Sequence, residues 1–211
     1  MAAPSDAHLL VLLGLRLKGA AGAATLAEHS GQPVGDVVAQ LADLAERGLA
    51  VERLAAPVGW TLTPAGRATV DRAVAAEVDT AGARPAVADA YRRFVPLNAT
   101  ALETCSRWQV RDVGGRPVRN DHGDRRYDTR VIGDLAHLQR RADPLLDDLA
   151  AALPRYRGYG PRLRRAVRMV ESGERDWFTG PSLPSYHTVW FELHEDLLAT
   201  LGLDRSQELV P

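Results

Sequence analysis

The order of the hydrophobic patterns in the N-terminal third constrains the fold more than any other feature of this chain. The first segment, SDAHLLVLLGLRLKG, offers Ser5 or Asp6 as an N-cap and continues as an apolar helix that ends at Gly19. A second, shorter helix is predicted over residues 25–30, and Gly31 supplies a tight turn before a third helix.

The pattern then changes from the helical period to the strand period and back. The third helix has apolar residues at helical spacing and stops at Gly48. Leu49–Leu54 alternates as a strand does, Ala55–Gly59 contains Pro and Gly, and Trp60–Leu62 is predicted as the returning strand of a hairpin. A fourth helix opens at Thr63, which is followed by Pro.

The order helix, helix, turn, helix, hairpin, helix is the plan of a winged helix-turn-helix domain. We therefore predict this domain from about Ser5 to about Asp79, with Gly31 in the bend between two helices. The side chains expected to be buried under the first helix are those of Leu26, Val38, Leu41 and Leu44. The segment GLAVERLAAPVGWTLTPAGR resembles the wing and the following helix of MarR-like and PadR-like bacterial regulators, and the resemblance covers roughly the first 80 residues.

The rest of the chain shows only helical patterns. One helix is predicted before Pro96, a second from Leu102 to about Val110, and a polar, Gly-rich loop over Asp112–Asp124. A long helix, a further helix after Pro161 and a last helix from about Ser185 follow. The predicted fold is thus mainly α: a winged helix-turn-helix domain with a small β-hairpin wing (residues 1–80), followed by an all-helical ligand-sensing or dimerisation domain (residues 84–211).

The C-terminal part carries a second resemblance. The stretch DWFTGPSLPSYHTVWFELHEDLLATLGLDR, together with NDHGDRRYD, is similar to the C-terminal half of uncharacterised actinobacterial proteins described as MarR-family regulators. This similarity implies a regulator but brings no catalytic residue with it.

Charge and cysteine content narrow the possible partners and the compartment. The net charge of −1 gives no general case for a nucleic-acid polyelectrolyte or a membrane surface as partner. A single cysteine, Cys105, excludes a disulfide framework and suits a reducing cytoplasm. The apolar stretch His8–Leu17 is too short to span a bilayer, so we expect a cytoplasmic protein with no membrane partner.

The third helix and the wing contain the residue types that read DNA. If residues 34–47 form a recognition helix, Gln40 can pair with an adenine edge, while Arg53 of the wing can contact a phosphate. Residues 1–80, however, hold six cationic against nine acidic side chains, a net charge of −3, which disfavours a DNA-binding surface. The predicted DNA contacts are Gln32, Gln40, Arg47 and Arg53.

The second half has the composition of a ligand pocket. His187 and His194 are two helical turns apart on the last helix, next to a concentration of aromatic residues, and a polar loop could close the opposite side. The alternative is a dry core in which each imidazole is satisfied by the protein itself. The predicted ligand contacts are Trp108, Asn120, His122, Trp177, Tyr186, His187, Trp190, Phe191, His194 and Glu195.

Other chemistries have less support. Six arginines within residues 155–168 form either an anion-binding face or a solvated face paired with nearby aspartates. Zinc usually needs short-spaced ligand pairs, and neither HxxxH nor HExxH occurs, so no metal and no cofactor is expected. GxSxG, Walker and GxGxxG motifs are also missing from the sequence.

The sequence predicts a ligand-responsive transcriptional regulator whose winged helix binds operator DNA. A homodimer is expected because operators are commonly two-fold symmetric. The alternative from another class is a protein-interaction or enzyme-accessory module whose acidic winged helix never meets DNA. A further alternative is a small-molecule enzyme that uses a pocket formed by His187 and His194, although an enzyme is the less favoured class.

Overall fold

The computed structural model describes residues 5–55 and 58–203, and this part of the chain is mainly helical with two separate two-stranded antiparallel hairpins. None of the helices in the described part is both long enough and apolar enough to cross a bilayer. The chain divides into two compact units, which we describe one after the other. The first unit comprises residues 5–55, 58–87, 152–155 and 194–203, and the second comprises residues 88–151 and 156–193.

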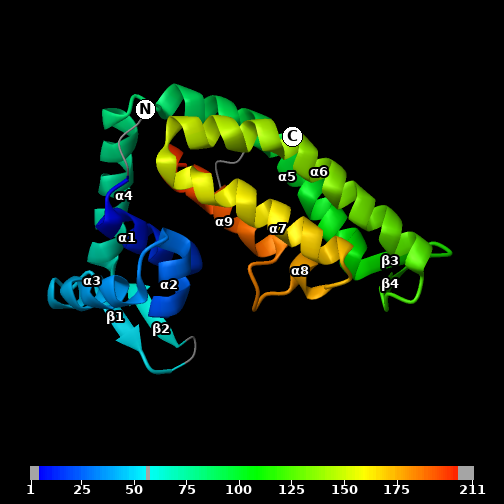
Figure 1. Ribbon diagram of the computed structural model, residues 1–211, viewed down its shortest axis with the longest axis horizontal. Helices are drawn as coiled ribbons and strands as arrows, with labels where there is room; N and C mark the ends of the chain where they lie inside the picture. The colour runs from blue at the N-terminus through cyan, green and yellow to red at the C-terminus, as the bar shows by residue number, and fades with distance from the viewer. Residues whose placement is uncertain (1–4, 56–57, 204–211) are drawn as a thin grey trace. The chain divides into compact units, whose positions relative to one another are not determined.

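The first unit begins with three helices, a hairpin and a fourth helix, in the order that the sequence predicts (Figure 1). Residues 56–57, in the middle of the predicted hairpin turn, lie outside the described residues. The elements are α1 (Ala7–Lys18), α2 (Ala23–Ser30), α3 (Val34–Glu46), β1 (Ala50–Arg53), β2 (Gly59–Leu62) and α4 (Pro64–Thr80).

Both ends of α1 and the turn between α2 and α3 have clear local causes. The carboxylate of Asp6 accepts hydrogen bonds from the backbone N–H groups of His8 (2.8 Å) and Leu9 (3.2 Å), which satisfies donors in the first turn. Gly19 ends the helix with a positive φ of 72°. Gly31 ends α2 in the left-handed conformation, with φ 69°, and lies in the bend before α3 as predicted.

The core of the first unit confirms most of the predicted buried residues and corrects one. Leu26, Leu41 and Leu44 are buried as expected. Val38 was expected beside them, but its exposed fraction is 52%. The prediction was wrong because Val37 takes the buried position on α3, and Val38 is turned about 100° away from Val37 around the helix axis.

The hairpin and α4 meet through an unusually close backbone approach. The hydroxyl of Thr63 accepts a hydrogen bond from the N–H of Gly66 (3.1 Å) and donates one to the carbonyl of Gly48 (2.7 Å). A Cβ atom at Gly66 would come within 2.0 Å of the carbonyl oxygen of Leu49. Gly66 therefore lets the first turn of α4 sit directly on the chain that enters β1.

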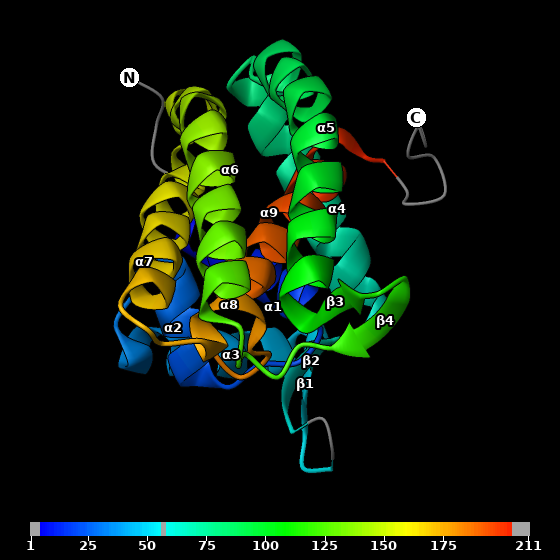
Figure 2. The same cartoon turned by 90° about the vertical axis from the view of Figure 1, so that its right-hand side faces the viewer.

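The second unit is built from longer helices, several of which also contribute residues to the first unit. Figures 1 and 2 show α5, α6 and α7 running alongside one another. Arg84–Val87 of α5, the end of α6, the start of η1 and the second half of α9 belong to the first unit. The elements are α5 (Arg84–Gln109), β3 (Val110–Val113), β4 (Arg116–Arg119), α6 (Arg125–Ala152), the 3₁₀ helix η1 (Pro154–Gly158), α7 (Tyr159–Glu171), α8 (Asp176–Thr179) and α9 (Tyr186–Leu201).

The hairpin β3–β4 contradicts the prediction of an all-helical second half. Its strands begin where a helix was predicted to end, near Val110, and continue into the segment that was predicted to be a loop, residues 112–124. Val113 pairs with Arg116 across the turn, and Gly114 and Gly115 between them have φ values of 63° and 81°. Two consecutive glycines with positive φ form the tight turn that joins twisted antiparallel strands, so the Gly-Gly pair was the signal for this hairpin.

Helix α5 also departs from the prediction, because it continues through Pro96 instead of breaking there. Proline removes one backbone N–H, so the carbonyl four residues earlier, that of Arg92, loses its helical donor. Pro96 and Arg92 are both exposed to solvent. Water can therefore satisfy this carbonyl, and the apolar residues on the buried face keep the helix continuous.

Polar side chains connect the helices of the second unit. Each hydrogen bond joins two different helices and involves a buried or half-buried partner. These bonds therefore fix how far one helix is shifted along its neighbour, which apolar packing alone does not determine. The bonds run from Trp190 Nε1 to Asn98 Oδ1 (3.0 Å), from Arg164 Nη1 to Asp143 Oδ1 (2.8 Å), from Arg162 Nη2 to Glu192 Oε2 (2.8 Å) and from the Tyr127 hydroxyl to the Arg107 carbonyl (2.9 Å).

Candidate functional site

Two of the predicted DNA contacts hold each other in place. Gln32 follows the turn glycine, and its amide nitrogen donates to the carbonyl of Ala7 at 3.0 Å. Gln40, on α3, donates from its own amide nitrogen to Gln32 Oε1 at 2.6 Å. The side-chain oxygen of Gln40 is buried and has no hydrogen-bond partner among the described residues. Gln40 must therefore leave Gln32 before it can read a base.

The two arginines predicted to contact DNA differ in whether they already form an ion pair. Arg47 forms an ion pair with Asp43 one turn earlier, at 3.1 Å. Arg53 is exposed on β1 and forms no ion pair within the part of the chain that the structure describes. The solvent-facing side of α3 is otherwise apolar and acidic, with the side chains of Val34, Asp36, Val38, Ala39, Ala42 and Glu46.

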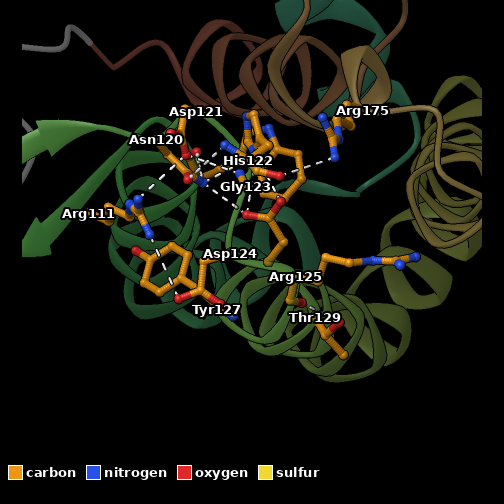
Figure 3. A network of polar contacts seen from close by, with 12 residues as sticks. Arg111, Asn120, Asp121, His122, Gly123, Asp124, Arg125, Tyr127, Thr129 and Arg175 are labelled. Carbon is orange, nitrogen blue, oxygen red and sulfur yellow. Dashed lines mark hydrogen bonds and ion pairs between the residues drawn. The ribbon is translucent and has the colours of Figure 1, made fainter.

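In the second unit, the structure brings together three of the predicted ligand contacts: Trp108, Asn120 and His122. Asn120 and His122 lie where the loop after β4 enters α6 (Figure 3), and Trp108 of α5 contacts both of them. Asp124 caps this helix by accepting hydrogen bonds from the N–H groups of Arg126 (3.1 Å) and Tyr127 (3.0 Å). The cap fixes the first turn of α6 close to the loop.

The centre of this cluster is the pair formed by His122 and Asp128. His122 Nδ1 lies 3.1 Å from Asp128 Oδ2 and 3.2 Å from Oδ1. Asp128 is 7% exposed, whereas the side chain of His122 keeps 20% of its surface in solvent. The carboxylate favours a proton on Nδ1, so neutral His122 presents Nε2 as an acceptor.

Asn120 holds the pair from the buried side. Its amide nitrogen donates to Asp128 Oδ1 (2.9 Å) and to the backbone carbonyl of Trp108 (3.1 Å). Its amide oxygen accepts the backbone N–H of His122 at 3.1 Å. His122 itself has a φ of 61°, which is uncommon outside glycine, so these bonds maintain a loop conformation that few side chains adopt.

An aromatic surface lies under the imidazole. The ring of His122 is tilted by 43° against Trp108, with centroids 4.3 Å apart. Phe178 of α8 stacks on Trp108, with ring centroids 4.4 Å apart and an interplanar angle of 10°. Both aromatic residues are buried, so His122 has an apolar wall on one side and solvent on another.

Two arginines add positive charge near the loop. Arg111 lies 3.5 Å from Asp121 and 3.7 Å from Asp124, and its buried Nε has no hydrogen-bond partner in the described chain. Arg175 donates to the backbone carbonyl of His122 at 3.3 Å. The backbone N–H of Gly123, followed by the charge of Arg111, lowers the pKa of Asp121 below its ordinary value.

This arrangement can accept a proton or a hydrogen bond at a defined atom. Nε2 of His122 forms no hydrogen bond within residues 5–55 and 58–203, whereas Nδ1 is held by Asp128. A carboxylate behind an imidazole fixes the tautomer and the ring orientation, and the buried aromatic pair supports the ring from one side. Asp128, Arg111 and Arg175 were not predicted as site residues, and Phe178 was expected only as a member of the aromatic concentration near the last helix.

Tyr186 and Trp190, two further predicted ligand contacts, lie in the packed interior of the second unit. Trp190 stacks on Phe94 at 5.0 Å and on Tyr186 at 5.7 Å. The hydroxyl of Tyr186 is buried without a hydrogen-bond partner in the described chain, and burial raises the pKa of this phenol well above its ordinary value.

The other predicted contacts are dispersed. Trp177 is half-buried under the guanidinium of Arg165, 4.9 Å from its ring centroid. His187 and Phe191 are exposed in the second unit. The remaining two, His194 and Glu195, belong to the first unit, where His194 is buried. A pocket shared by His187 and His194 therefore stays a prediction.

Three of the six arginines within residues 155–168 form ion pairs with specific carboxylates of the described chain. Arg164 pairs with Asp143 as the paired alternative suggested, and Arg162 pairs with Glu192. Arg155 is buried in the first unit, where it pairs with Glu77 of α4 and Asp196 of α9.

Comparison with other proteins adds no family to this description. The described residues contain no group of three or more His, Cys, Asp or Glu side chains placed to hold a metal ion. No protein-family model matches the chain, and no curated protein or solved structure matches it either.

Proposed function

We propose that this chain is a ligand-responsive transcriptional regulator that binds operator DNA through a winged helix-turn-helix formed by its first unit. The observation that carries the proposal is the pair α2–α3, joined by the left-handed Gly31 and followed directly by the hairpin β1–β2. A helix presented in this way fits the major groove, with the hairpin beside the backbone. Two-fold operators make a homodimer the expected state.

The side chains of this surface define how binding would work. Gln40 reaches a base only after its bond to Gln32 breaks, which costs about 1 kcal/mol. Arg53, and Arg67 at the exposed start of α4, are available for phosphates. Because few cations face the DNA, the dependence of affinity on salt should be shallow, with a slope of roughly 0.9 for each phosphate neutralised.

Fluorescence anisotropy with the DNA upstream of the chain's own gene tests this proposal. Arg53→Ala should weaken binding to every duplex and reduce the salt slope by about one unit, because it removes one phosphate contact. Gln40→Ala should weaken binding to the cognate duplex by about 1–3 kcal/mol and leave scrambled DNA unaffected. The charge-matched control is Arg140→Ala on the exposed side of α6.

A second candidate function is protein docking by the same face of α3. It is favoured by Val34 and Val38, which are 49% and 52% exposed and lie among the acidic residues of α3. Apolar side chains surrounded by acids suit a basic protein partner better than a polyanion. Failure to bind any duplex even at about 50 mM salt, with circular dichroism showing a folded chain, would leave this candidate as the better one.

The effector part of the proposal rests on the cluster around His122. Its oriented imidazole offers a hydrogen-bond acceptor and the two nearby arginines offer donors, which suits a small polar ligand that carries both a donor and an acceptor or anionic group. We propose this cluster as the effector contact of the second unit. An NMR titration of the chain with candidate effectors, followed through the His122 ring signals, tests this assignment. A ligand that binds elsewhere leaves those signals unchanged.

A further inference from the structure

A cavity in the first unit involves no residue of the His122 cluster and, of the predicted DNA contacts, only Arg47. It has a volume of about 660 Å³ and lies between the start of α1, the second half of α4 and the segment Leu153–Pro154. Its walls are mostly apolar and include Leu9, Leu12 and Ala76. This volume and lining are typical of sites for small organic molecules.

Two carboxylates are among the polar groups of this mostly apolar wall. One belongs to Asp6, which accepts two backbone N–H groups as the N-cap of α1 and forms no ion pair with another described residue. The other belongs to Glu77, whose side chain is 15% exposed and accepts a hydrogen bond from the Ser5 hydroxyl. Glu77 is thus largely shielded from solvent, where a charge interacts more strongly than in water, while Asp6 lies at the exposed edge of the cavity.

The cationic side chains near these two carboxylates also interact with other carboxylates. Arg155 donates to Glu77 Oε2 at 2.7 Å, but the same guanidinium also pairs with Asp196. At the rim of the cavity, His8 and Arg47 both lie next to Asp43, at 3.5 Å and 3.1 Å. The cavity wall consequently favours a ligand that brings its own positive charge or its own donors.

We propose that this cavity binds a small, mainly apolar amine. The hydrocarbon part packs against Leu9, Leu12 and Ala76, and the ammonium group donates hydrogen bonds to Asp6 and Glu77. The ammonium takes over the acceptor position on Glu77 that the Ser5 hydroxyl occupies. This site does not depend on whether the first unit binds DNA.

Isothermal titration calorimetry of the full chain, without DNA, tests the proposal with three probes that share one phenylethyl group. They are 2-phenylethylamine, 2-phenylethanol and 3-phenylpropionate, which differ only in a cationic, neutral or anionic head. At neutral pH the amine should bind most tightly and at least about tenfold more tightly than the carboxylate, because Asp6 and Glu77 attract the ammonium group and repel the carboxylate; a tenfold ratio corresponds to about 1.4 kcal/mol.

Variants separate the cavity from non-specific binding. Ala76→Trp fills the cavity from an exposed helix position and should weaken amine binding at least about tenfold, whereas Ala68→Trp, also exposed on α4 but outside the cavity lining, should not. Asp6→Asn keeps an N-cap residue but removes the charge, so it should weaken binding of the amine and leave the alcohol unchanged. Equal binding of all three probes, unchanged affinity in Ala76→Trp, or no amine binding to the wild-type chain would overturn the proposal.

Discussion

His122 Nδ1 lies 3.1 Å from Asp128 Oδ2, so a loop imidazole is oriented by a carboxylate on the first turn of the following helix. The two residues are close in sequence, but their contact needs the hairpin β3–β4 to set the start of α6 and Asn120 to bond to both. The relationship is therefore a product of the local fold.

Asp128→Asn should change the tautomer of His122. With the carboxylate present, the Nδ1–H form is favoured, and the neutral amide removes that preference. Long-range ¹H–¹⁵N NMR should show a protonated Nδ1 in the wild-type chain and a mixture of tautomers in the variant. The control is Asp134→Asn on the same helix, whose exposed ion pair with Arg107 leaves His122 untouched. Identical ring signals in wild type and Asp128→Asn would contradict the pairing.

Leu41→Ala should lower the free energy of unfolding by about 2–5 kcal/mol, because Leu41 is 1% exposed in the core of the first unit. Val38→Ala, three residues earlier on the same helix, should change it by less than about 0.5 kcal/mol because Val38 is exposed. Urea denaturation followed by circular dichroism measures both. Equal losses in the two variants would show that the buried face of α3 is wrongly assigned.

Two glycine-to-alanine substitutions should change the stability of the folded chain in opposite directions. Gly66→Ala places a Cβ 2.0 Å from the carbonyl oxygen of Leu49 and should destabilise the chain by more than about 1 kcal/mol. Gly35→Ala, on the exposed side of α3 with no atom within 4 Å of the added Cβ, should stabilise it by about 0.5–1 kcal/mol. Thermal unfolding should rank Gly35→Ala above wild type and Gly66→Ala below it; the reverse order would refute the close approach of α4 to β1.

The stability of the chain should fall in alkaline solution through Cys105. Burial raises the pKa of this thiol from 9.0 to about 12, so above pH 9 the unfolded chain loses the proton while the folded chain retains it. The free energy of unfolding should then fall between pH 9 and 12, by at most about 1.4 kcal/mol per pH unit. Denaturation at successive pH values should show a shallower fall for Cys105→Ala. Parallel curves for the two proteins would contradict the burial of an un-ionised thiol.

The sequence was most informative where structure depends on short-range patterns. Gly31, Gly48 and the alternation after Leu49 were sufficient to predict three helices, a hairpin and a fourth helix in the observed order. The same reasoning failed at Val38, because a hydrophobic pattern does not show which of two adjacent valines faces the core. It also missed the hairpin at Gly114, since the flanking strands are exposed and lack a buried face.

The candidate site was predictable only in part. Trp108, Asn120 and His122 stood out by residue type and by their proximity in the sequence. Phe178 and Arg175 come from a different segment, around α8, and nothing in the spacing relates them to the loop. Such partners are determined by how the helices of the second unit pack, which short-range patterns do not contain.

Binding of the chain to its own upstream DNA tests the central claim most directly. The measurement is the ratio of affinities for that duplex and for a scrambled duplex of the same length, taken at about 150 mM salt by fluorescence anisotropy. A winged-helix regulator should prefer the cognate duplex by at least about 10³-fold, the low end of specific DNA recognition. A ratio near one, or no binding to either duplex by the folded chain, would contradict the account and leave α3 as a protein-docking surface.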